Sequence, residues 1–251
     1  MMRYGRVTLG PILLVSMLGC GAPSAGDCWN VLQRGHDRLA LEQDAGRLAS
    51  VEAKRARNLI RESLSQCGSN SRGKHLYSGV DGGHDLYLTR LDMAIMANDA
   101  ELVLKEFRSK IRTESDTPLN WAPYYGDDHV VLAAFFEADD ALRVLLEEGA
   151  DPNNVDEQGL SALHVIGGQT VAAQAIIELL VTAGVDINSR SNRIALTPLE
   201  LALLTKNVTK AKCLLDLGAS VDESNLNTEQ SRLLLQIAQE DVEVGFRCES
   251  I

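Results

Sequence analysis

The sequence predicts an all-α solenoid of about four helix-turn-helix repeats, with an N-terminal helical hairpin before it and a C-terminal capping helix after it. Three observations carry this prediction. Alignment of the chain with itself gives a period of about 33 residues after residue 88. Glycines expected just past the second helix of three units, Gly149, Gly184 and Gly218, lie 35 and 34 residues apart. Leucine pairs shortly before each glycine supply faces on which neighbouring units stack.

The repeated unit has a recognisable pattern. Its clearest copy opens with the turn Asp156–Gly159, continues through Leu163 and His164, and closes with the segment 183–188, AGVDIN. This pattern resembles the ankyrin repeat, which has a D-x-x-G turn, a T-P-L-H opening and a G-A-D-x-N ending. Further copies begin near Thr89, Asp128 and Thr197, so the resemblance covers roughly residues 88–222. It implies an array of helix pairs that binds other proteins, with His164 bonding between repeats.

Local signals set the limits of several helices. The hydroxyl of Thr197 can cap a first helix, and Pro198 then occupies its first position, where no donor is lost. The apolar spacing of residues 228–238 predicts a helix that caps the stack. We therefore expect a helical hairpin over 28–75 and a repeat domain with its cap over 76–251.

The first residues are typical of an export signal. Arg3 and Arg6 precede an apolar run that is too short to span a bilayer, for which about 20 residues are needed. The run ends in Met-Leu-Gly-Cys20, which resembles the lipobox of bacterial lipoproteins. The resemblance implies a signal peptide over 1–19, acylation of Cys20 with chains such as palmitate, and a tether over 20–27. It places the protein in the periplasm, at the inner leaflet of the outer membrane; the alternative is an ordinary cleaved signal.

Four cysteines remain after Cys20, and an oxidising compartment permits disulfides between them. We expect Cys28 to pair with Cys67 and Cys213 with Cys248. The first pair requires a hairpin folded near Gly46, because one continuous helix would hold the two cysteines about 60 Å apart. The alternative for this pair is two free buried thiols.

Charge is distributed unevenly along the chain. The formal net charge is −11, made up of +1 over residues 1–27, +4 over residues 28–75 and −16 over residues 76–251. An acidic surface repels phosphate backbones, so nucleic acid is not an expected partner. The basic residues of the hairpin, Arg57 and Arg61 among them, form either a solvated face or a face that meets anionic lipid.

No catalytic centre, metal site or cofactor is predicted. The chain has no H-E-x-x-H, G-x-S-x-G or paired C-x-x-C motif. The segment Gly68–Lys74 matches a phosphate-loop spacing, but His75 replaces the hydroxyl residue that would hold magnesium. We therefore expect a non-enzymatic protein.

The expected partner site is the long connection between the first two repeats. Trp121, Tyr124, Tyr125 and Phe136 lie close together there, and aromatic residues of this kind anchor interfaces at low rotamer cost. The alternative is that they pack onto the first repeat, and Phe135 is assigned to the core. Other connections supply secondary contacts: Asp156, Glu157, Gln158, Arg190, Asn192 and Arg193.

These features predict a membrane-anchored module, monomeric when free, that binds a protein partner through an acidic, aromatic-edged groove. A specific form is an immunity protein that occludes a toxic secreted effector enzyme. The alternatives are a scaffold for an envelope complex and an accessory protein in periplasmic oxidative defence.

Overall fold

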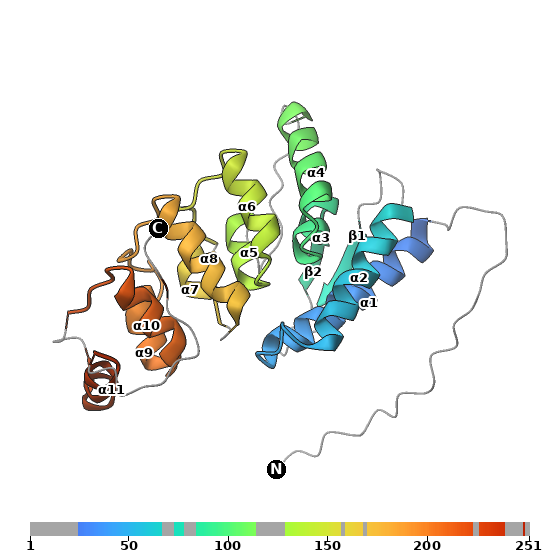
Figure 1. Ribbon diagram of the computed structural model, residues 1–251. Helices are drawn as coiled ribbons and strands as arrows, with labels where there is room; N and C mark the ends of the chain where they lie inside the picture. The colour runs from blue at the N-terminus through green and yellow to red at the C-terminus, as the bar shows by residue number, and fades with distance from the viewer. Residues whose placement is uncertain are drawn as a thin grey trace, which may run out of the picture.

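The computed structural model describes residues 25–66, 73–77, 84–113, 129–156, 159–167, 170–222, 226–238 and 248. Within this part the chain forms eleven helices and one two-stranded sheet. The helices stack side by side as a row of pairs, from α1 and α2 at one end to α11 at the other (Figure 1). The repeat solenoid predicted from the sequence is therefore present.

An antiparallel hairpin of α1 (Ala25–Asp44) and α2 (Val51–Gln66) forms the first layer. Its turn contains Gly46 in the left-handed region, at φ +65°. Glu42 accepts hydrogen bonds from Arg47 at 2.9 and 3.1 Å and from Ser50 at 2.7 Å, which fixes the turn. The helices approach closely at Gly35, where an added Cβ would lie 2.6 Å from Cγ1 of Ile60. The turn lies where the sequence predicts it.

A β-hairpin follows, in a region for which the sequence analysis predicts no strands. Strand β1 (Gly73–Tyr77) pairs antiparallel with β2 (His84–Leu88), with Gly73 opposite Leu88 and Tyr77 opposite His84. The short segment between the strands is rich in glycine, which is typical of a hairpin connection. Strand β2 ends at the residue before Thr89, the N-cap of the first repeat.

Four helix pairs form the repeats. They are repeat 1 with α3 (Arg90–Met96) and α4 (Ala100–Thr113), repeat 2 with α5 (His129–Phe135) and α6 (Asp139–Glu147), repeat 3 with α7 (Ala162–Val165) and α8 (Val171–Thr182), and repeat 4 with α9 (Pro198–Leu204) and α10 (Val208–Asp216). Helix α11 (Thr228–Ala238) contacts α9 and α10 and covers the end of the array. Its limits agree with the predicted capping helix.

Caps begin and end these helices as the sequence predicts. Thr197 Oγ1 accepts from the backbone N–H of Glu200 at 3.2 Å, and the Glu200 carboxylate accepts from the N–H of Thr197 at 2.9 Å. Gly149, Gly184 and Gly218, at φ of +90°, +87° and +92°, follow the second helices of repeats 2, 3 and 4. These conformations explain why glycine recurs at this position.

Asparagine side chains join successive repeats. Asn153 Oδ1 accepts from the backbone N–H of Asp186 at 2.8 Å, and Asn188 Oδ1 accepts from that of Ser220 at 2.8 Å. Both asparagines end a G-[AV]-D-x-N segment, so the repeated sequence makes a repeated bond. Leucines fill the space between the helices without solvent exposure: Leu142, Leu145, Leu163, Leu180, Leu199 and Leu214.

Arginines of the N-terminal hairpin bind the repeats. Arg57 donates to the carbonyl oxygen of Phe136 at 2.6 Å, and burial lowers the pKa of its guanidinium. Arg61 donates to the carbonyl oxygen of Ala97 at 2.9 Å and to Asp99 at 3.1 Å. These two side chains attach the hairpin to repeats 1 and 2. The sequence predicts either a solvated face or a lipid-binding face for the basic residues, and neither interpretation anticipates this contact.

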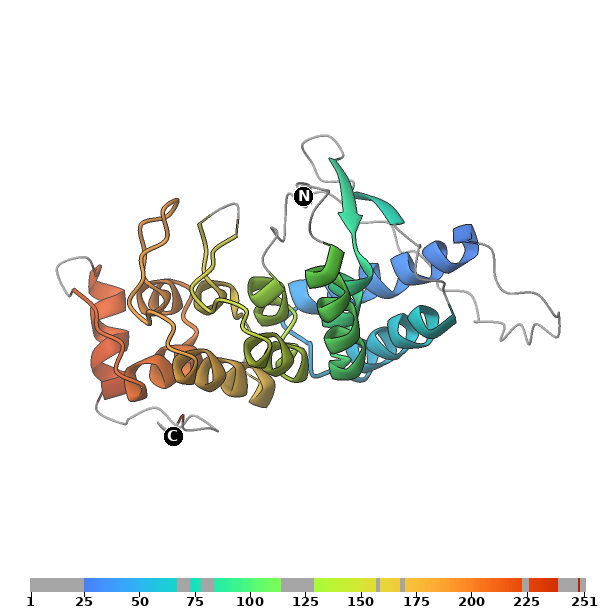
Figure 2. The ribbon, with the colours of Figure 1, turned by 90° about the horizontal axis from the view of Figure 1, so that it is seen from above.

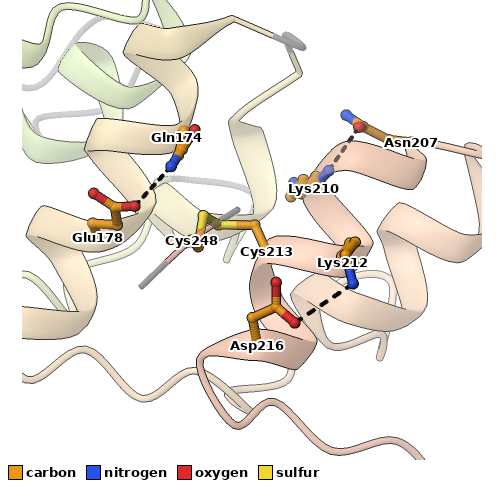
Figure 3. Close-up of a disulfide and its surroundings, with 8 residues drawn as sticks. All are labelled: Gln174, Glu178, Asn207, Lys210, Lys212, Cys213, Asp216 and Cys248. Atoms are coloured by element: carbon orange, nitrogen blue, oxygen red, sulfur yellow. Dashed lines mark hydrogen bonds and ion pairs between the residues drawn. A yellow bond between two sulfur atoms is a disulfide. The ribbon is translucent and has the colours of Figure 1, made fainter. Parts of the chain in front are cut away.

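A disulfide fastens the C-terminal segment to repeat 4 (Figure 3). It joins Cys213 of α10 to Cys248, with 5.0 Å between their Cα atoms. Both cysteines are buried, and the bond joins the pair that the sequence predicts. The predicted pairing of Cys28 with Cys67 lies outside the described side chains, and Cys20 lies outside the described residues.

No helix in the described part of the chain combines the length and apolar character needed to cross a bilayer.

Candidate functional site

The loops that precede the first helices project toward one side of the array (Figure 2). We call this side the finger edge. It comprises finger 1 (the β1–β2 hairpin), finger 3 (Val155–Ser161) and finger 4 (Ser191–Leu196). The second finger corresponds to residues 114–128, which lie outside the described residues together with Trp121, Tyr124 and Tyr125.

Finger 3 is held in shape by hydrogen bonds among its own residues. Val155 and Ser161 form an antiparallel bridge. Asp156 Oδ1 accepts from the N–H of Leu160 at 2.8 Å, and the carbonyl oxygen of Asp156 accepts from the N–H of Gly159 at 2.8 Å. Asp156 is buried, so its carboxylate stabilises the turn, and its expected role as a partner contact is wrong. The secondary contacts Glu157 and Gln158 lie outside the described residues.

Finger 4 is closed by an ion pair at its base. Arg190 donates to Glu200 at 2.8 and 3.0 Å and to the carbonyl oxygen of Ala195 at 2.6 Å. Ser191 is buried and its N–H donates to the carbonyl oxygen of Leu196 at 3.0 Å. Arg190 therefore braces the finger with its donors, although its side chain keeps 46% exposure. Arg190 thus holds finger 4 in position more than it offers a free contact to a partner.

Fingers 3 and 4 touch near their tips. A Cβ on Gly159 would lie 3.1 Å from Cβ and 3.2 Å from the backbone nitrogen of Asn192. Asn192, Arg193 and Ile194 are exposed at the tip of finger 4, and Val155 is 47% exposed on finger 3. The two fingers thus form one preorganised edge that presents apolar and basic side chains.

The structure overturns the expectation for one of the two adjacent phenylalanines. Phe136 is fully buried, so its assignment to a partner contact is wrong. It directly follows α5 and its N–H donates to the carbonyl oxygen of Leu132 at 3.1 Å, and its ring meets that of Phe135 edge to face at 5.1 Å. Phe135, assigned to the core from the sequence, is partly buried and packs against the core.

Charged residues concentrate on the second helices, where both signs occur in equal number. The helices α4, α6, α8 and α10 carry seven acidic residues, Glu101, Glu106, Asp139, Asp140, Glu147, Glu178 and Asp216, and seven basic residues, Lys105, Arg108, Lys110, Arg112, Arg143, Lys210 and Lys212. The first helices carry only Arg90 and the acidic residues Asp92 and Glu200, and both of these acids close capping boxes. Among the described residues the expected acidic groove is therefore replaced by a nearly uncharged inner layer.

His164 connects repeats 3 and 4. Its Nδ1 accepts from the N–H of Ser161 at 3.2 Å, and its Nε2 lies 3.0 Å from the carbonyl oxygen of Leu196. Burial lowers the pKa of the imidazole, which keeps Nδ1 available as an acceptor. The role of His164 in bonding between repeats, implied by the resemblance, is confirmed.

Lys210 is a buried cation that the sequence analysis missed. Its Nζ donates to the carbonyl oxygens of His164 at 2.9 Å and Ile166 at 2.8 Å, and burial lowers its pKa to about 7. A signal was available: the position three residues after the cap of the second helix is Ala173 in repeat 3 but lysine in repeat 4. A lysine at a position that is otherwise small and buried indicates a special contact.

No group of three or more potential metal ligands occurs within the described residues. The expectation of a protein without a metal or cofactor stays a prediction.

Stacked helix pairs joined by bonded fingers define a repeat module of the protein-binding class. The family model for ankyrin repeats matches three copies over residues 130–225, and this segment therefore consists of ankyrin repeats. The matched segment covers repeats 2 to 4, whereas repeat 1 lies before it. Ankyrin repeats are protein–protein interaction modules.

A comparison with curated proteins finds a similarity to the nuclear factor NF-kappa-B p105 subunit of Gallus gallus. The two are 32% identical over 145 residues, which is 56% of this chain and 14% of that protein. The similarity therefore covers only a small part of that relative's length.

Proposed function

We propose that this protein is a membrane-anchored ankyrin-repeat module that binds a partner protein along the finger edge. The observation that carries the proposal is the contact of Gly159 with Asn192, which joins two internally bonded fingers beneath exposed side chains. Such an edge has little conformational entropy to lose on association, so its exposed residues can contribute more of their contact energy.

The partner surface that suits this edge is acidic with apolar patches. Arg193 and Ile194 are exposed at the tip of finger 4, and Val155 accompanies them on finger 3. The charged residues of the second helices lie in the other layer of the array and balance one another, so they do not repel such a partner. Trp121, Tyr124 and Tyr125 of the second finger are proposed to extend the same contact.

We place the protein in the periplasm, anchored through an acylated Cys20 at the inner leaflet of the outer membrane. The basic and apolar first residues support this location, as does the disulfide between Cys213 and Cys248, since disulfides persist in oxidising compartments. Replacement of Cys20 by serine tests the anchor. The variant is expected in the soluble envelope fraction. Wild-type protein in that soluble fraction would contradict the proposed placement, and so would either protein in the cell interior.

The specific activity we propose is immunity: the anchored module occludes a toxic effector enzyme that enters the envelope. A protein-binding edge held at a membrane fits this role, because occlusion requires binding and no chemistry. The neighbouring genes give a direct check, since an adjacent secreted hydrolase is expected.

The binding edge is tested by a pair of charge substitutions. Ile194→Asp on finger 4 is expected to abolish recovery of the partner from envelope extract after crosslinking. Val171→Asp is the matched control, because Val171 is also apolar and exposed but lies at the start of α8, in the layer of second helices. Equal recovery with both variants would place the interface elsewhere, and a resident envelope protein as the partner would favour the scaffold function.

A further inference from the structure

The first helix of repeat 3 is one turn shorter than its counterparts, and a hollow lies beside its end. Helix α7 has 4 residues, whereas α3, α5 and α9 have 7 each. After Val165 the chain leaves the helix, and Ile166 takes φ −59° and ψ 115°. The hollow has a volume of about 280 Å³ and lies between this end and the α9–α10 turn of repeat 4. That size corresponds to the lower end of small-ligand sites.

The floor of the hollow is buried and its rim is exposed. Ile166, Asn207 and Lys210 form the floor, and Lys210 retains 3% exposure. Gly167 and Thr205 line the rim and are exposed, so the hollow opens to solvent.

The ammonium group at the floor has one donor without an acceptor. Two of the three N–H groups of Lys210 reach the carbonyl oxygens of His164 and Ile166. No carboxylate of the described residues forms an ion pair with Nζ, which contrasts with Lys212 on the same helix, paired with Asp216 at 3.8 Å (Figure 3). Buried charges are costly unless they are paired. Lys210 therefore lacks a negative partner and borders a space that can hold one.

We propose that the hollow is a binding site for a carboxylate, which accepts the third hydrogen bond of the Lys210 ammonium while its short apolar stem contacts Ile166. The carboxylate comes either from a small free acid or from an acidic side chain of a bound polypeptide. Inorganic anions without a stem fit less well, because the floor offers an apolar surface beside the single cation. This site is separate from the finger edge and does not depend on the proposed function.

The charge state of Lys210 gives the binding a measurable signature. With a pKa of about 7, roughly half of the lysines are neutral at pH 7, so carboxylate binding takes up about half a proton per site. The other titratable groups that line the hollow are His164 on α7 and Lys206 at the rim. The N–H group without an acceptor belongs to Lys210 and not to His164 or Lys206. Variants of Lys210 therefore separate its contribution to proton uptake from theirs.

Calorimetry of the full chain with sodium propionate tests the site. Titrations in buffers of different ionisation enthalpy at pH 7 are expected to report binding with proton uptake, and affinity is expected to fall about tenfold per pH unit above 7. Propionamide, the neutral analogue, is expected not to bind. A peptide with a single glutamate distinguishes the polypeptide source from the free acid, since only a site that accepts polypeptides binds it.

Three variants make the test decisive. Lys210→Met is expected to remove both the binding and the proton uptake. Thr205→Trp narrows the rim without touching Lys210 and is expected to weaken binding at least tenfold, which keeps the test valid if Lys210→Met fails to fold. Lys212→Met is the matched control and is expected to bind as wild type does. Absence of propionate binding to the wild-type chain, or binding that survives in both Lys210→Met and Thr205→Trp, overturns the proposal.

Discussion

Lys210 predicts an unusual pH dependence of stability. The pKa of its ammonium is about 7 in the folded protein against an ordinary value of 10.5. Between these values the unfolded chain binds a proton that the folded protein has released. Because stability rises with pH wherever the unfolded state binds more protons, the free energy of unfolding increases from pH 7 upward until the ordinary pKa is reached.

The magnitude follows from the two pKa values. Raising the pH from 7 to 9 is expected to stabilise the fold by about 2 kcal/mol through Lys210 alone, since each unit of pKa difference corresponds to about 1.4 kcal/mol. The cause is structural: neutral Lys210 keeps its two donors on His164 and Ile166 and no longer buries a charge.

Urea unfolding at pH 7, 8 and 9 measures this effect, with the Cys213–Cys248 disulfide kept intact. Other titrating groups cancel when wild type is compared with Lys210→Met, which is expected to lose the rise of about 2 kcal/mol. Lys212→Met serves as the control and is expected to keep it. Parallel pH profiles for wild type and Lys210→Met would refute the assignment of a buried, unpaired ammonium.

Three further substitutions test the backbone and the disulfide. Gly184→Ala is expected to lower stability by about 1 kcal/mol in thermal unfolding, because alanine is disfavoured at φ +87°. No atom lies within 4 Å of the new Cβ, so the cost is purely conformational and a larger loss would contradict this reasoning. Lys206 has φ +57°, a left-handed conformation that costs less for glycine, so Lys206→Gly is expected to raise the free energy of unfolding by up to about 1 kcal/mol. The exposed ion pair with Glu229 is lost but contributes little, and a lower urea midpoint would contradict this expectation. Cys248→Ser opens a loop of sequence separation 35 and is expected to cost about 3 to 4 kcal/mol by urea unfolding, whereas an unchanged midpoint would mean that the bond does not form.

The repeat architecture could be predicted because its signals are local. A glycine that ends a helix and a threonine that caps one act within a few residues, so Gly184 and Thr197 could be assigned from spacing alone. The cap formed by α11 follows from periodic apolar residues in the same way. The pairing of Cys213 with Cys248 was predicted from the oxidising compartment and from the order of the cysteines along the chain.

The candidate sites were predicted less well because exposure is not a local property. Phe135 and Phe136 are adjacent and chemically identical, and only tertiary packing decides that Phe136 is fully buried whereas Phe135 is partly buried. Asp156 and Arg190 have the composition of solvated turn residues, but both are used to hold their own fingers.

The sequence by itself determined where the helix pairs begin and end, since caps, turns and periodic leucines act over short stretches of chain. Only the tertiary structure decided the use of Arg57, which clamps the hairpin to repeat 2, and of Lys210, whose charge lies at the floor of the hollow between repeats 3 and 4. Both side chains meet partners more than 40 residues away, and the energy of a buried charge depends on those partners and on solvent access, which no local pattern encodes.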